Sequence, residues 1–269
     1  MLPHQTPVRE LFVSVDAAEA LLRDAAGLTT WDLTPRQIAG LDLMLHGGLA
    51  PLRGFMTEAD HDGVIRDMRL PHGMFWPLPV TLDVPESFAV LVEPGQDIAL
   101  RDGAGAILAL LSVTDRWRPG AAETVWQGDP AGPIRLGGPV AGLRAPDLPM
   151  RQTPNTLRSL LRQQGIERVV AITTGQDIPP HLAGAPGITL LVQPMDGHAG
   201  LPPNAIPLPL VPEVAGTRGR LWQALVLRNH GATHLLPSPD DPPELVRLYA
   251  ETGLTLLERT RIEDFRRGQ

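Results

Sequence analysis

A buried apolar run leads directly into a glycine turn in the stretch Arg168-Val169-Val170-Ala171-Ile172-Thr173-Thr174-Gly175-Gln176-Asp177. The four apolar residues lie between a charge and Thr-Thr-Gly, which predicts a short strand buried on both faces, as strands of a parallel sheet are. Ligands of open α/β sheets bind just beyond the carboxyl ends of such strands, where glycine lets the backbone approach closely. We therefore expect any active site at this turn.

Composition restricts the class of protein. The chain has 269 residues, of which 43% are hydrophobic, and this is enough for about two domains with their own cores. A formal net charge of −7 disfavours a nucleic-acid partner, because a phosphate backbone attracts basic surfaces. Since the chain has no cysteine, disulfides, thiol nucleophiles and cysteine-bound metal clusters are excluded.

The start of the chain and its apolar runs bear on its location. Met1-Leu2-Pro3-His4-Gln5 has neither the basic region nor the apolar run of a signal peptide. No apolar stretch approaches the roughly 18 residues that a membrane-spanning helix needs. We expect a cytoplasmic protein without a membrane partner.

The first half of the chain predicts helices followed by a β-rich segment. Apolar spacing favours helices, and Thr34 with Gln37 forms a capping box in front of the second one. Pro-Glu, Pro-Gly and Asp-Gly turns then separate short apolar runs, which predicts a small antiparallel β-domain. The expected helices are 17–23, 36–45 and 64–68, and the expected strands are 78–84, 89–92, 97–100, 107–113 and 134–140. A proline-containing linker from Leu143 to Pro154 marks the domain boundary.

The second half alternates helix and strand patterns, as βαβ units of a parallel sheet do. Its expected elements are a helix from Thr153-Pro154 to Gly165, strands at 169–172 and 188–192, an irregular proline-rich segment to Leu210, a helix at 218–229, a strand at 234–236 and a helix at 243–251.

Several blocks, in order along nearly the whole chain, resemble the ATP sulfurylases (sulfate adenylyltransferases). The blocks are Leu33-Thr34-Pro35-Arg36-Gln37, Leu41-Asp42-Leu43, Gly47-Gly48-Leu49-Ala50-Pro51-Leu52-Arg53-Gly54-Phe55-Met56, Trp76-Pro77-Leu78-Pro79-Val80-Thr81-Leu82-Asp83-Val84, Gly137-Gly138-Pro139-Val140, Leu221-Trp222-Gln223-Ala224 and Arg228-Asn229-His230-Gly231-Ala232-Thr233-His234. The resemblance implies an α/β protein with a PUA-like N-terminal β-domain at 1–147 and a shortened Rossmann-like nucleotidyltransferase α/β domain at 148–269. Members of this family make adenylyl sulfate and pyrophosphate from ATP and sulfate.

Three motifs that handle charge in that family are degraded in this chain. The family's "QTRNPMHRAH" turn has Thr173 at its Gln, Gly175 at its Arg and Gln176 at its Asn, with Pro179 and Leu182 at its two His. The sulfate-holding and phosphate-contacting side chains are thus replaced.

The second motif, "MRYAGP", has Glu213 at its Arg, and a carboxylate there would repel a nucleotide. The third, "GRDHAG", reads Ser238-Pro239-Asp240-Asp241-Pro242-Pro243. It keeps only Asp240, and its prolines remove backbone N–H donors that could face a phosphate.

These changes predict a non-catalytic relative, a pseudoenzyme with a structural or regulatory role near sulfate activation. It would have no catalytic residue, metal or cofactor, and would bind ATP or adenylyl sulfate weakly in a remnant pocket. The pocket residues are Thr173, Thr174, Gln176, Arg218 and Asp240. We also expect a homo-oligomer or a partner among sulfate-activation enzymes.

Two alternatives remain open. The chain is an active nucleotidyltransferase, or binds a related nucleotide or anion, if Thr173-Thr174-Gly175-Gln176 and Arg218 form a remodelled pocket, joined by Asp196, His198 and Asp240 as polar or metal-binding groups. RNA binding through the PUA-like domain rests on fold analogy alone and is disfavoured by the acidic balance.

Overall fold

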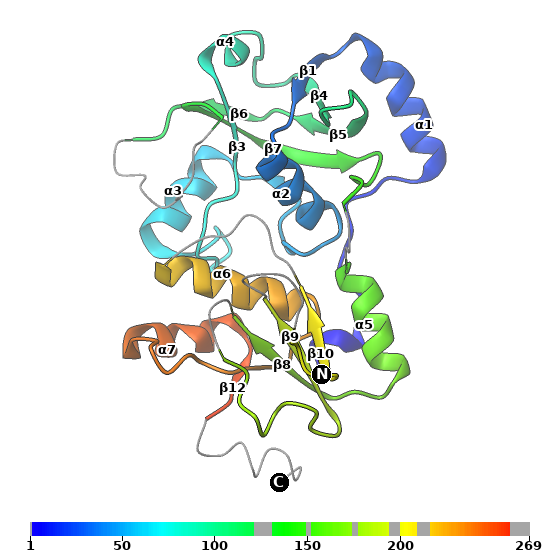
Figure 1. Cartoon of the computed structure of the whole chain (residues 1–269). Coiled ribbons are helices and arrows are strands. Elements are labelled where there is room, and N and C mark those ends of the chain that lie inside the picture. Colours follow the sequence, from blue (N-terminus) through cyan, green and yellow to red (C-terminus); the bar gives the residue numbers. More distant parts are fainter. Residues whose placement is uncertain are drawn as a thin grey trace. The chain divides into compact units, whose positions relative to one another are not determined.

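The computed structural model describes residues 2–120, 131–148, 152–173, 177–193, 200–208 and 216–258. The chain divides into two compact units, Arg9–Pro149 and Met1–Val8 together with Met150–Gln269 (Figure 1). Each unit has its own sheet.

The first eight residues belong with the C-terminal part of the chain, whereas the sequence placed them in the N-terminal domain. Nη1 of Arg158 donates to the carbonyl oxygen of Thr6 at 2.6 Å and also to that of Pro3. The side chain of Asn155 bonds both backbone groups of Val8, at 2.9 and 3.0 Å. Side-chain hydrogen bonds across about 150 residues of sequence carry no local pattern, so periodicity could not reveal this docking.

The described part of Arg9–Pro149 forms a seven-stranded sheet in the order β1-β4-β5-β7-β2, with β3 and β6 also paired to β7. The strands are β1 (Thr29–Asp32), β2 (Gly54–Phe55), β3 (Leu82–Val84), β4 (Asp97–Arg101), β5 (Ile107–Ser112), β6 (Asp115–Trp117) and β7 (Ile134–Gly142). All pairs are antiparallel except β1 with β4. The expected β-domain is therefore present, and β1, β2 and β6 are added to the strands that the sequence indicated.

Strand β7 crosses its neighbours so closely that glycine is needed at its centre. Gly138 has a φ of 146°, and a Cβ there would lie 2.0 Å from the carbonyl oxygen of Ser112. A Cβ on Gly137 would lie 2.2 Å from the carbonyl oxygen of Met56. Both glycines permit a backbone approach that a side chain would block.

Four α-helices accompany this sheet in the described part of the unit: α1 (Val15–Asp24), α2 (Pro35–Leu45), α3 (Glu58–Asp67) and α4 (Glu86–Ala89), with a short 3-10 helix η2 (Ala25–Gly27) after α1. The strand expected at 89–92 is wrong, because Ala89 ends α4. Pro85 precedes that helix in extended backbone, and the burial of Phe88 and Ala89 against the core decides the local structure. The helix expected at 64–68 begins earlier, at Glu58, where Thr57 and Asp60 form a capping box.

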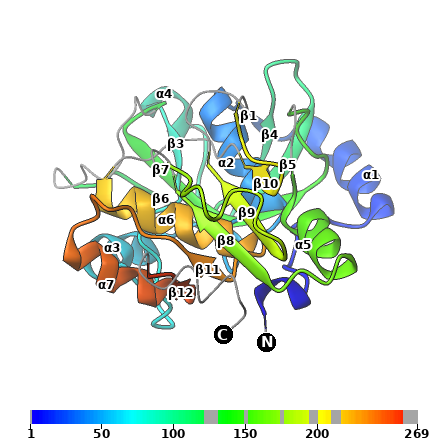
Figure 2. The ribbon, with the colours of Figure 1, turned by 60° about the horizontal axis from the view of Figure 1, so that its bottom comes forward.

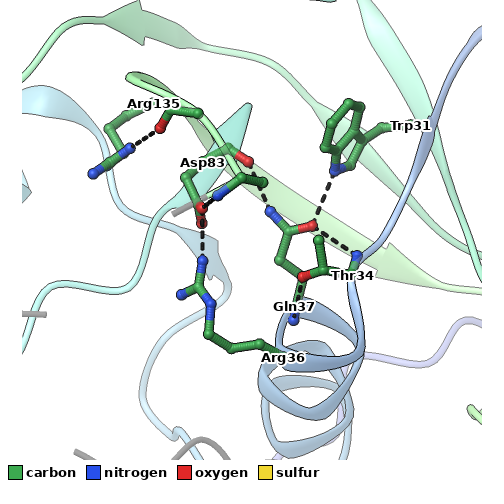
Figure 3. Close-up of polar contacts among 8 residues, drawn as sticks. Trp31, Thr34, Arg36, Gln37, Asp83 and Arg135 are labelled. Atoms are coloured by element: carbon green, nitrogen blue, oxygen red, sulfur yellow. Dashed lines mark hydrogen bonds and ion pairs between the residues drawn. The ribbon is translucent and has the colours of Figure 1, made fainter. Parts of the chain in front are cut away.

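The capping box predicted for α2 is confirmed and does more than cap (Figure 3). Oγ1 of Thr34 accepts from the backbone N–H of Gln37 at 3.2 Å, and Oε1 of Gln37 accepts from the N–H of Thr34 at 3.0 Å. Nε2 of Gln37 donates to the carbonyl oxygen of Asp83 in β3 at 2.7 Å. Oε1 of Gln37 accepts a second hydrogen bond from Nε1 of Trp31 in β1 at 3.1 Å. Gln37 thus links α2 to β1 and β3.

A buried ion pair lies beside that link. Nη2 of Arg36 is 2.6 Å from Oδ2 of Asp83, whose side chain is 4% exposed. The backbone N–H of Ala131 donates to the same carboxylate. The carboxylate is therefore well supplied with donors, as a buried charge must be.

The C-terminal unit contains an all-parallel sheet in the order β10-β9-β8-β11-β12 (Figure 2). Its strands are β8 (Arg168–Ile172), β9 (Ile188–Val192), β10 (Ala205–Pro207), β11 (His234–Leu235) and β12 (Thr255–Leu256), and its helices are α5 (Pro154–Gln163), α6 (Gly216–Asn229) and α7 (Pro243–Tyr249), with short 3-10 helices η1 (Pro3–Gln5) and η3 (Ala250–Thr252). The chain adds strands outward from β8 on one side and then returns to its other side at β11.

The central strand β8 is the run with which the sequence began. Its residues Val169 to Ile172 are 0% exposed, which confirms the predicted burial on both faces. Thr233 fixes the neighbouring strand, because its Oγ1 accepts from the N–H of Val169 at 3.0 Å. Asn204 joins the next loop to the sheet by donating to the carbonyl oxygens of Leu182 and Ile188.

Candidate functional site

The direction of strand addition reverses between β8 and β11, and the carboxyl ends of both strands meet there. In open α/β sheets this is the edge where ligands bind. Thr173 directly follows β8 and is 1% exposed. After β11, the backbone N–H of Leu236 still donates to the carbonyl oxygen of Ala171 at 3.1 Å, and the chain then turns into α7.

A buried carboxylate, that of Asp241, occupies this turn. Its Oδ1 is ion-paired with Nη1 of Arg220 from α6. Its Oδ2 accepts from the backbone N–H of Ser238 at 2.8 Å and from the hydroxyl of Tyr249 at 3.2 Å. The Asp241 side chain is 0% exposed, whereas that of Arg220 is 37% exposed. We call Asp241, Arg220, Ser238 and Tyr249 the Asp241 cluster.

Local sequence explains how the turn forms. The Asp241 side chain reaches back three residues to the N–H of Ser238, and the backbone N–H of Asp241 donates to the carbonyl oxygen of Ser238 at 3.1 Å. This is the local side-chain bonding that makes aspartate frequent in turns. Pro243 then begins α7, where a missing N–H costs nothing, and the helix carries Tyr249 at its end.

The electrostatics of the cluster keep its tyrosine protonated. Burial, followed by the charge of Asp241 and the hydrogen bond to it, raises the pKa of Tyr249 well above its ordinary value of 10.0. The Arg220 charge and a hydrogen bond with Thr173 oppose that rise in pKa. Tyr249 is therefore a hydrogen-bond donor to Asp241 near neutral pH, and Thr173 is adjacent to the cluster.

The five residues expected in the remnant pocket have different outcomes. Thr173 lies at the predicted strand end beside the cluster, while Thr174 and Gln176 lie outside the described residues. Arg218 is half-buried on the first turn of α6, where burial lowers its pKa. Asp240 is exposed, and its backbone N–H donates to Oγ of Ser238 at 3.4 Å. Asp240 is the direct neighbour of Asp241, whose side chain is buried in the turn.

None of the four residues of the Asp241 cluster was selected as a site residue from the sequence. Arg220 is separated from Asp241 by 21 residues and meets it only through packing of α6 beside the turn. One signal was available, since Asp241 directly precedes two prolines and follows the turn-forming Ser238-Pro239. Tyr249 is the single tyrosine of the chain.

The positions matched to the family's two histidines have become part of the core. Leu182 is 0% exposed and packs in one apolar cluster with Val170, Ile172 and Ile188. Pro179 is buried too, and its carbonyl oxygen accepts from the N–H of Leu182 at 2.9 Å. The side chains of proline and leucine offer no hydrogen-bond donors to a ligand.

Two features are absent from the part of the chain that the structure covers. Among the residues it places, no three His, Cys, Asp or Glu side chains gather in a way that could hold a metal ion. Asp196 and His198, which the remodelled-pocket alternative invoked, lie outside these residues, as do Gly175 and Glu213. None of the placed helices is long and apolar enough to cross a membrane.

Two arginines of the N-terminal unit, Arg66 and Arg69, make contacts within that unit. Nε of Arg66 is 2.8 Å from Oδ2 of Asp67, and Nη1 of Arg69 donates to the carbonyl oxygen of Gly73 at 3.1 Å. An acidic neighbour on the same exposed surface weakens attraction to a phosphate backbone.

Strand order, parallel pairing and the position of the turn define a Rossmann-like α/β unit, and a mainly antiparallel β-unit precedes it. Comparison with known proteins agrees with both. Residues 1–131 match the family model described as a PUA-like domain. A solved structure entitled "Hexameric APS kinase from Thiobacillus denitrificans" superposes with a TM-score of 0.73 and 28% sequence identity, covering 93% of this chain and 55% of that one.

Curated sulfate adenylyltransferases are similar to most of this chain. The sulfate adenylyltransferase of Eremothecium gossypii is 30% identical over 286 residues, and that of Saccharomyces cerevisiae is 31% identical over 289 residues. Each match covers 88% of this chain, but only 57% and 56% of the respective relatives. The chain is thus a homologue of the sulfate adenylyltransferases, and it spans little more than half the length of the relatives it matches.

Proposed function

We propose that this chain is a non-catalytic member of the sulfate adenylyltransferase family with a structural or regulatory role in sulfate activation. The observation that carries the proposal is the buried carboxylate of Asp241 at the carboxyl ends of β8 and β11. A nucleotide triphosphate and sulfate are both anions, and a site for them needs unengaged positive charge and N–H donors.

Two donors that the structure describes at this edge are already used. Arg220 and the N–H of Ser238 both bind Asp241, so neither is directed at an incoming phosphate. A phosphate about 4–6 Å from the Asp241 carboxylate would be repelled, because two like charges at this distance repel by about 1 kcal/mol in water and by more in a cleft. The core positions of Pro179 and Leu182 add no compensating cation.

An activity assay tests the proposal directly. Purified protein is supplied with ATP and either sulfate or molybdate, and release of pyrophosphate is followed, with the Saccharomyces cerevisiae relative as the positive control. We expect no release above the background without enzyme. Typical enzymes turn over at about 10 per second, so turnover above roughly 0.1 per second overturns the proposal.

Binding separates the proposal from a remodelled but functional pocket. Calorimetric titration with ATP, adenylyl sulfate and sulfate is expected to show millimolar or weaker binding. Micromolar binding of any of the three supports a ligand-binding role and removes the basis for a purely structural one.

Assembly is the remaining part of the proposal. We propose that the protein works in the cytoplasm as a homo-oligomer or together with an enzyme of sulfate activation, which the hexameric state named for the similar solved structure favours. Light scattering coupled to size-exclusion chromatography measures the mass directly. A 29.0 kDa species at all concentrations, with no shift on adding a sulfate adenylyltransferase, contradicts this part.

A further inference from the structure

Three donors converge on one buried carboxylate in the Asp241 cluster, and they come from three separate elements. Arg220 supplies a guanidinium from α6, Ser238 supplies a backbone N–H from the turn after β11, and Tyr249 supplies a hydroxyl from the end of α7. Guanidinium, backbone N–H and hydroxyl groups are the donors with which proteins bind sulfate and phosphate.

We propose that the carboxylate of Asp241 is an internal substitute for a tetrahedral oxyanion, so that Arg220, the Ser238 N–H and the Tyr249 hydroxyl form a sulfate or phosphate site that the chain fills with its own side chain. This inference deepens the proposed non-catalytic function and rests on it, because a site closed from within explains how the turn stays ordered without a substrate.

The exposure of the cluster's side chains indicates how an external anion could replace the Asp241 carboxylate. The Asp241 side chain is 0% exposed, but that of Arg220 is 37% exposed, so one donor of the site reaches solvent. Shortening Asp241 leaves a cation, an N–H and a hydroxyl without their common acceptor. Buried donors without an acceptor are unfavourable, and an oxyanion that enters from the Arg220 side would restore all three bonds.

The test replaces the carboxylate and measures the response to inorganic sulfate. Asp241→Gly and Asp241→Ala open the space, and Asp240→Ala is the matched control because it removes the adjacent, exposed carboxylate. Thermal unfolding is followed while sodium sulfate replaces sodium chloride at constant ionic strength, and then with phosphate in place of sulfate.

We expect wild type and Asp240→Ala to respond equally and weakly, through the general stabilising effect of sulfate. The Asp241 variants should start at a lower Tm and gain roughly 5–10 °C more than the control when sulfate reaches about 100 times its Kd. The double variant Arg220→Ala/Asp241→Ala should lose that gain. An equal response of Asp241→Ala and Asp240→Ala overturns the inference.

A second readout remains usable if the glycine and alanine variants do not fold. Asp241→Ser removes the charge, opens space for an anion and keeps a small polar group, and the single tyrosine of the chain reports on the site through its ultraviolet absorbance. Loss of the charge should lower the pKa of Tyr249, and bound sulfate should raise it again. A Tyr249 pKa in Asp241→Ser that sulfate does not move contradicts an anion at this position.

Failure of this inference and failure of the proposed function are distinguishable. Turnover of ATP and sulfate by wild type removes the non-catalytic function, whatever the variants bind. An absent sulfate response in the variants removes the anion site, while the wild-type assay is unaffected.

Discussion

The hydroxyl of Tyr249 lies 3.2 Å from Oδ2 of Asp241 and donates a hydrogen bond to a carboxylate that is fully buried. Because burial and the negative charge raise the pKa of Tyr249 above its ordinary value of 10.0, the native state keeps a proton that the unfolded state releases. The stability contributed by this proton is therefore fully present below pH 10.0 and is lost as the pH rises through the native-state pKa.

Tyr249→Phe tests this relationship. The variant should be less stable than wild type by about 1–3 kcal/mol near neutral pH, since Asp241 loses a donor. Wild type should lose stability relative to the variant as the pH rises from about 9 to about 11, because only wild type has this titrating group. Urea unfolding across that range measures the difference. Parallel pH profiles of the two proteins would contradict the assigned environment of Tyr249.

Arg158→Met should release the N-terminal segment from the C-terminal unit. The guanidinium of Arg158 donates to the carbonyl oxygens of Pro3, Thr6 and Asn229, and burial followed by the charges of Arg228 and Arg162 lowers its pKa from 12.5 to about 10. Charged hydrogen bonds contribute about 1.5–3 kcal/mol each, so we expect a loss of at least about 3 kcal/mol in the free energy of unfolding.

The control for that variant is Arg162→Met, because Arg162 makes a weaker, exposed contact with the carbonyl oxygen of Gln5 at 3.3 Å. It should cost about 1 kcal/mol or less. Hydrogen exchange at residues 4–8 gives a local readout, and equal protection of these amides in both variants would refute the role of Arg158.

Asp83→Ala should strongly destabilise the N-terminal unit. It removes one partner of the buried Arg36 ion pair and the acceptor of the Ala131 N–H, and breaking such a pair costs about 3–5 kcal/mol. Asp32→Ala is the control, because it breaks an ion pair with Arg101 in which the Asp32 side chain is 61% exposed. It should cost about 1 kcal/mol or less. Denaturant unfolding followed by tryptophan fluorescence compares the two, and similar costs would contradict the difference in burial.

Gly138→Ala should prevent correct folding of the N-terminal unit. Its added Cβ would meet the carbonyl oxygen of Ser112, and its φ of 146° is unfavourable for alanine. Gly103→Ala is the control, because its Cβ has no atom within 4 Å. We expect soluble, cooperatively unfolding protein only from the control, as judged by expression, circular dichroism and thermal unfolding. A stable Gly138→Ala protein would show that β7 can move away from Ser112.

Local patterns predicted the elements of this fold where local contacts decide them. The capping box of Thr34 and Gln37 is one example, because its two partners are three residues apart. The strand at Val169 to Ile172 is another, because its own apolar run indicates it although its partner strands are distant in sequence. The segment at 89–92 failed because a single turn of helix after Pro85 buries Phe88 and Ala89, whereas Val90 and Leu91 stay exposed.

Residues of the candidate site were harder to predict than the site's position. The strand end was found from its apolar run and glycine, but Asp240 and Asp241 are identical side chains one residue apart. Only the packing of α6 and α7 decides which of them meets Arg220 and Tyr249. A comparison of sequence blocks cannot show which of the two aspartates is buried, since this depends on how α6, α7 and the turn after β11 pack together.

Docking of the first eight residues on the C-terminal unit also constrains how the protein forms during synthesis. His4 bonds the carbonyl oxygen of Gly231 across 227 residues, so a segment that leaves the ribosome early has partners that leave it late. Arg9–Pro149 can fold while the C-terminal unit is still being made, but that unit is completed only after the whole sheet has emerged. The earliest residues of the chain are thus among the last to reach their native contacts.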